Sequence, residues 1–243
     1  MDKNEFEARV ADALPIDTRA AGALMMAAAV VSIAFVALDP EVTATTSRTI
    51  LEGFVANGPM HRLVHAIELA CVLCLAFGFT SLAARAGLRR PAVMGACIAY
   101  VVGCLAMVAA AVTDGFITGD VASYYLQAGH NPDTGREMLH LCYAVVQDFA
   151  MASWFFQSIG VLAMAIALLR GRGLQRIVGA LGLATGAIPP IAILATWPAM
   201  DTGIIVGILS AQLAWNAAAA TLLMRRTVFT ATSGALPRVA LAA

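Results

Sequence analysis

Six apolar stretches of about 20 residues or more most restrict how this chain can fold. About 20 apolar residues in a helix cross the ~30 Å hydrocarbon layer of a bilayer, where only helices and closed barrels satisfy their backbone polar groups. The sequence therefore predicts an all-α, polytopic membrane protein, a bundle of six transmembrane helices. The predicted spans are residues 20–38, 62–84, 92–113, 139–169, 175–197 and 203–224.

The composition supports this fold class and excludes others. Hydrophobic residues make up 60% of the chain and charged residues only 12%, against about a quarter in soluble domains. The net charge is zero, so nothing indicates a nucleic-acid partner. Lys3 is the single lysine and lies outside every span, which excludes a retinal Schiff base. The expected partners are the lipid bilayer and a hydrophobic small molecule.

The basic residues predict the orientation. With six spans, both termini lie on one side, together with twelve of the fifteen Lys and Arg residues; the other side carries only Arg48, Arg62 and Arg136. Because cytoplasmic loops are enriched in Lys and Arg, we expect both termini in the cytoplasm of a bacterial inner membrane. The chain then divides into a cytoplasmic segment 1–18, a transmembrane domain 19–226 and a cytoplasmic tail 227–243.

Ionisable residues at the start of the second span point to a functional site. His61, His65 and Glu68 occupy positions i, i+4 and i+7, so they share one helix face. Asp114 ends the third span and His140 begins the fourth, both on the same outer side. We therefore expect these groups to converge beneath the outer membrane face. Ionisable groups inside a span are costly, which makes them a functional hypothesis by default.

A metal site is the leading interpretation. His61, His65, Glu68, Asp114 and His140 are residue types that ligate zinc, iron, manganese or copper. In an enzyme acting on a lipid-phase or periplasmic small molecule, Glu68 would serve as ligand or general base. Asp148, eight residues after His140, would be a supporting group or proton relay.

The sequence leaves two alternative interpretations of these polar residues open. Haem b could be held by His65 and His140 as axial ligands, with Arg62 and Arg136 near the propionates. The same polar residues could instead be interhelical hydrogen-bonding groups in a non-catalytic binding module, or in a transporter that uses a protonatable carboxylate.

Small residues in the last two spans predict close helix contacts. Gly182 and Gly186 form one G-x-x-x-G pattern, and Gly203 and Gly207 form another. This spacing is typical of closely packed membrane helices, so these faces are compatible with a homo-oligomer.

The layout also resembles uncharacterised small six-helix inner-membrane proteins of bacteria. The residues behind this resemblance are Thr18-Arg19-Ala-Ala-Gly22, Gly115-Phe116, and Trp215-Asn-Ala-Ala with Arg225-Arg226. The resemblance covers most of the chain and implies no activity.

Overall fold

The computed structural model describes residues 18–36, 44–196 and 202–225, and the single positions 38, 40 and 42. These residues are helical, with short connections. The N-terminal segment 1–17 and the tail after residue 225 lie outside the described residues. The elements are α2 (Thr18–Val36), α3 (Ser47–Ala86), α4 (Pro91–Val112), the π-helix η1 (Thr113–Ile117), α5 (Thr118–Tyr125), α6 (Pro132–Leu169), α7 (Leu174–Thr196) and α8 (Thr202–Met224).

The helices pack as a ring. In order around it they are α2, α3, α4, α6, α7 and α8, and α8 packs against α2 to close the ring. Within the described residues, five helices are long and apolar enough to cross a membrane, and α2 is a shorter apolar helix. The prediction of an all-helical membrane bundle is thus confirmed for the described residues. α7 continues as one helix through Pro189 and Pro190.

Two sequence signals explain the ends of α3. Thr46 caps its N-terminus, since the Thr46 and Thr49 side chains each accept a hydrogen bond from the other residue's backbone N–H at 3.3 Å. Gly87 ends it with φ of 99°, a left-handed conformation that favours glycine. α3 therefore begins 15 residues before the predicted span at residue 62.

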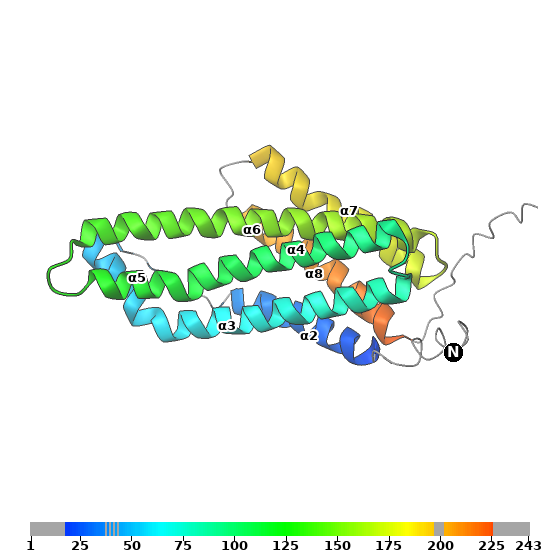
Figure 1. Cartoon of the computed structure of the whole chain (residues 1–243), viewed down its shortest axis with the longest axis horizontal. Coiled ribbons are helices and arrows are strands. Elements are labelled where there is room, and N and C mark those ends of the chain that lie inside the picture. Colours follow the sequence, from blue (N-terminus) through cyan, green and yellow to red (C-terminus); the bar gives the residue numbers. More distant parts are fainter. Residues whose placement is uncertain are drawn as a thin grey trace, which may run out of the picture.

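Three helices extend well past the others at one end of the molecule (Figure 1). α3 has 40 residues, α6 has 38, and α4, η1 and α5 run together for 35. At ~1.5 Å per residue they are about 50 to 60 Å long, roughly twice the hydrocarbon thickness. The helix of the predicted third span, residues 92–113, therefore runs on to residue 125, because η1 and α5 continue α4 without a break.

The extension has its own small core of Leu51, Ala122 and Leu139, distinct from the main core of the ring. The main core centres on Phe79, which stacks on Tyr100 with ring centroids 3.9 Å apart. Residues 61–68 of α3 and η1 lie in sequence between these two cores. Within these segments His61, His65, Glu68 and Asp114 form a polar cluster.

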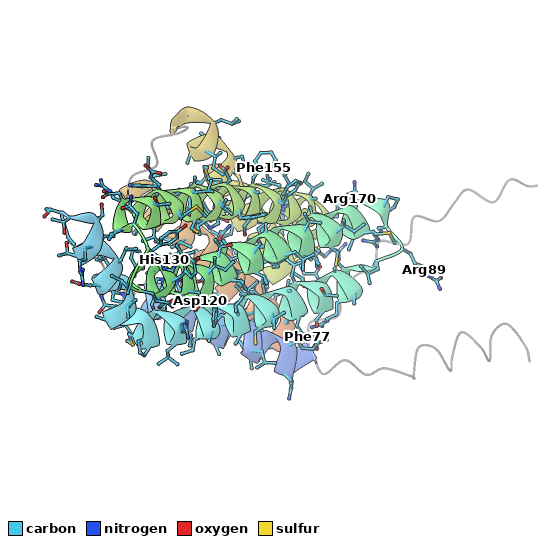
Figure 2. The ribbon with its side chains drawn as sticks, turned by 60° about the vertical axis from the view of Figure 1, so that its left-hand side comes forward. Phe77, Arg89, Asp120, His130, Phe155 and Arg170 are labelled. Atoms are coloured by element: carbon cyan, nitrogen blue, oxygen red, sulfur yellow. The ribbon has the colours of Figure 1, made fainter. Side chains whose placement is uncertain are left out.

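The two ends of the bundle differ in charge. Arg89 and Arg170 lie at one end, and Asp120 and His130 lie at the other (Figure 2). Arg85 at the basic end donates a hydrogen bond to Leu223 O of α8 at 3.1 Å. The start of α2 is at the same end, since a Cβ added at Gly22 would come within 2.8 Å of Ala220 O.

Candidate metal centre

α3 presents His61 and His65 toward α4 and η1, one turn apart. Their ring centroids are 4.6 Å apart, and the planes of the two rings meet at 79°. Both residues are buried, with relative exposures of 8% and 6%. The i, i+4 spacing therefore places two imidazoles side by side in the interior, as the sequence predicted.

The π-helix η1 carries Asp114 to the two imidazoles. His61 Nε2 donates to Asp114 O at 3.1 Å, and Thr118 Oγ1 donates to the same carbonyl oxygen. The carboxylate lies beside both rings: Asp114 Oδ1 is 3.5 Å from His61 Nε2, and Oδ2 is 3.6 Å from His65 Nε2. Single π-helical turns inside α-helices are frequent at functional sites, because the extra residue redirects the side chains around it.

Gly115 allows this approach. A Cβ at Gly115 would overlap the Cβ of His65 and lie within 2.7 Å of its ring carbon Cγ. Glycine is thus required here for the close approach of η1 to α3. In the sequence, the only sign of this close approach is the position of Gly115 directly after Asp114.

Glu68 holds His65 from the other side. Glu68 Oε2 is 3.0 Å from His65 Nδ1. A carboxylate only accepts hydrogen bonds, so Nδ1 carries the proton, and Nε2 is the nitrogen that faces Asp114. A carboxylate that fixes the tautomer of a histidine in this way is the usual support for a metal-ligating imidazole.

His61, His65 and Asp114 together form a group that can hold a metal ion. Their ligand atoms all lie within 4.8 Å of one another, and within the described part of the chain this is the one such group of three or more residues. Glu68 contacts this group through its hydrogen bond with His65. The group contacts a cavity of about 160 Å³ that is otherwise lined mainly by apolar residues, among them Ala110, Ala111 and Leu209.

The structure leaves four predicted site residues outside this group. His140 and Asp148 are both exposed on α6. The inward face of α6 at this level carries Val146 and Ala150 instead. Arg62 pairs with Asp120 of α5 at 2.6 Å, and Arg136 is exposed.

The exposure of His140 also removes the geometric basis of the haem alternative. That alternative needs imidazoles of His65 and His140 to face one another across a porphyrin. His65 is buried against Glu68 and Asp114, whereas His140 is exposed on α6.

Comparisons with family models, curated proteins and solved structures give no match to this chain.

Proposed function

We propose that this chain is a multi-pass protein of the bacterial inner membrane that binds one transition-metal ion through His61, His65 and Asp114. Glu68 orients His65 and tunes the site. The proposal combines an apolar helix bundle with two buried nitrogen ligands and one partly buried carboxylate.

The spacing of the ligand atoms carries the proposal. His65 Nε2 lies 3.6 Å from Asp114 Oδ2. His61 Nε2, which donates to Asp114 O in the metal-free protein, lies 3.5 Å from Asp114 Oδ1 and would exchange its proton for the ion. These distances are too long for hydrogen bonds. In a tetrahedral site with ligands at ~2.0–2.2 Å, two ligand atoms are about 3.4 Å apart. His65 Nε2 and Asp114 Oδ2 are therefore spaced as two ligands of one cation.

Two nitrogens and one carboxylate oxygen suit zinc, iron, manganese or copper(II). Three protein ligands also leave a coordination position open, as catalytic sites do. We propose that this position faces the adjoining cavity and that the ion activates water or a small hydrophobic molecule there. Glu68 lines the same cavity and is the nearest candidate for a proton acceptor.

The orientation proposal follows from the charge of the two ends. We propose that the arginine-rich end faces the cytoplasm, which places the three-helix extension and the metal centre on the periplasmic side. A periplasm-dependent reporter inserted in the loop at residues 126–131 should be active, and one fused after Arg226 should be inactive. The opposite pattern would overturn this orientation.

Metal analysis tests the site directly. Protein purified without a histidine tag should contain close to one equivalent of metal, which His65→Ala should remove. His140→Ala is the matched control, since it deletes an exposed imidazole from the same side and should leave the metal content unchanged. Absence of metal from the unaltered protein, also after reconstitution with each of the four ions, would refute the proposal. A Soret band lost in His140→Ala would point to haem instead.

A further inference from the structure

Two cavities adjoin inside the bundle next to the candidate metal centre. The larger, of about 160 Å³, is the one that the metal centre contacts. The smaller, inner cavity measures about 70 Å³ and is lined by residues of α2, α3, α4, α6 and α8. The two spaces adjoin because they share four lining residues, which are Glu68, Met107, Trp154 and Leu209.

Away from the metal centre, the larger cavity has mainly apolar walls. Helices α4, α6 and α8 form these walls through side chains such as Ala110, Val146, Ala150 and Ile205. Apolar cavities stay free of water but accept apolar molecules, and a cavity of about 150 Å³ accepts benzene. The larger cavity therefore has the size and the walls for a molecule with a single six-membered ring.

Two buried donors in the linings of these cavities lack an acceptor. Trp154 lines both cavities and is only 6% exposed, and Gln212 lines the smaller one. Within the described residues, Trp154 Nε1 and Gln212 Nε2 are buried atoms that have no hydrogen-bond partner. Because a buried N–H group without an acceptor is costly, both donors favour a bound molecule that supplies an acceptor oxygen.

We propose that the two adjoining cavities bind a small, uncharged ring compound that carries a carbonyl group. The ring occupies the larger cavity, and the carbonyl oxygen accepts a hydrogen bond from Trp154 Nε1, with Gln212 as the second donor. A carbonyl group meets this need because its oxygen has two lone pairs and donates no proton.

The charges of the two linings exclude ionic ligands. Glu68 and Asp114 line the larger cavity, and no Lys or Arg is among the described residues of either lining, so an anion would be repelled. A cation would leave the Trp154 and Gln212 donors without an acceptor. An uncharged acceptor is the one class of ligand that satisfies both donors without burying a further charge.

Ligand binding does not depend on a metal ion, whereas its consequence for function rests on the proposed metal site. A molecule in the larger cavity lies beside His65 and Asp114, which line the same space. With an ion bound there, the ring compound is the molecule closest to the open coordination position. The inference thus narrows the small hydrophobic molecule of the proposed function to a carbonyl compound.

Two matched ligands test this assignment on metal-free protein in nanodiscs. Cyclohexanone and methylenecyclohexane have the same ring and nearly the same shape, but only the ketone has an acceptor oxygen. With each affinity referred to the ligand dissolved in the lipid of empty nanodiscs, we expect saturable ketone binding about tenfold tighter than that of the alkene. The carbonyl stretching band of the bound ketone should also shift to lower frequency than in lipid. Absence of saturable ketone binding, or equal affinities for the two ligands, would overturn the proposal.

Substitutions of the donors then test the recognition. Trp154→Phe removes the Nε1–H group, so it should lower the ratio of ketone to alkene affinity severalfold and move the carbonyl band back toward its position in lipid. Gln212→Leu should lower the ratio less. Trp215→Phe is the matched control, because Trp215 Nε1 is also buried without a hydrogen-bond partner but Trp215 lines neither cavity. Its ratio should equal that of the unaltered protein.

The affinity ratio separates recognition from packing, because a general loosening of the bundle changes the affinities for both ligands alike. An unchanged ratio in Trp154→Phe would refute the hydrogen bond to Trp154. Metal analysis of the same samples keeps the two proposals apart. Ketone binding by a protein that takes up no metal would refute the metal site alone, and metal binding without ketone binding would refute the ligand site alone.

Discussion

The bundle contains two buried polar regions that differ in chemistry. The outer region joins His61, His65 and Asp114 at distances of 3.1 to 3.6 Å between their polar atoms. The inner region, around Gln212 and Asn216, consists of neutral amides and hydroxyls beside a cavity. Ionisable groups in mutual contact can hold an ion. Neutral amides and hydroxyls join helices to one another, as Asn216 of α8 does when it accepts a hydrogen bond from Tyr100 of α4.

Gly115→Ala should have the largest effect on this comparison, because the added methyl overlaps His65 Cβ. We expect the free energy of unfolding to fall by about 1–3 kcal/mol, as for an overpacked core, and metal binding to be lost. Thermal unfolding in detergent and metal analysis measure both. Gly95→Ala on α4 is the control: nothing lies within 4 Å of its added Cβ, so its stability should stay equal or rise. Full metal binding by Gly115→Ala would contradict the assignment of a close approach.

Asp114→Asn should have the second-largest effect. The change keeps the shape of the side chain but removes the charged ligand. Loss of a residue that only supports a ligand typically lowers metal affinity roughly 10- to 100-fold, and loss of this ligand should lower it further. Competition with a chromogenic chelator gives the affinity. Asp148→Asn, on the exposed side of α6, should leave it unchanged. Equal losses in both variants would mean that bulk charge, and not coordination, governs binding.

Glu68→Gln should have an intermediate effect, with metal affinity lower by about tenfold. The amide oxygen can still accept from His65 Nδ1, but it lacks the charge that strengthens the imidazole as a ligand. Glu52→Gln is a matched control, because Glu52 is exposed and pairs with Arg48 at 2.9 Å. An affinity loss as large as that of Asp114→Asn would show that Glu68 is itself a ligand.

Tyr100→Phe should have the smallest effect and separate the two regions. It removes one hydrogen bond to Asn216, a loss of about 0.5–1.5 kcal/mol in the free energy of unfolding. Metal affinity should not change, since Tyr100 belongs to the inner region. A fall in metal affinity would show that the two regions are coupled.

The local part of the site was predictable from the sequence. The i, i+4 and i+7 positions of His61, His65 and Glu68 follow from the helical period alone, and the length of the apolar stretches placed Asp114 near the same depth. The depth of a residue in the membrane follows from its distance in residues from the end of its span. Residues near the same end of neighbouring helices are therefore expected at a similar depth.

The direction of a side chain around a helix could not be predicted in the same way. His140 lies on the same outer side of the predicted bundle as Asp114, but α6 turns Leu139, Val146 and Ala150 inward and leaves His140 exposed. Packing against its neighbours sets the rotation of a helix about its axis. Near His140, α6 carries apolar residues on every face, so hydropathy alone does not predict which face turns inward. Gly182 shows the same dependence: it packs against Trp215 and Ala165 within the chain, so this G-x-x-x-G face serves the bundle itself.

The sequence by itself determined the class of the protein, the apolar spans and the shared face of His61, His65 and Glu68, because hydropathy and helical period act locally. Only the tertiary structure decided the partners of that face. The π-turn at Asp114, the contact that Gly115 permits and the inner cavity all depend on how closely separate helices approach one another, and that distance is set jointly by side chains far apart in the chain.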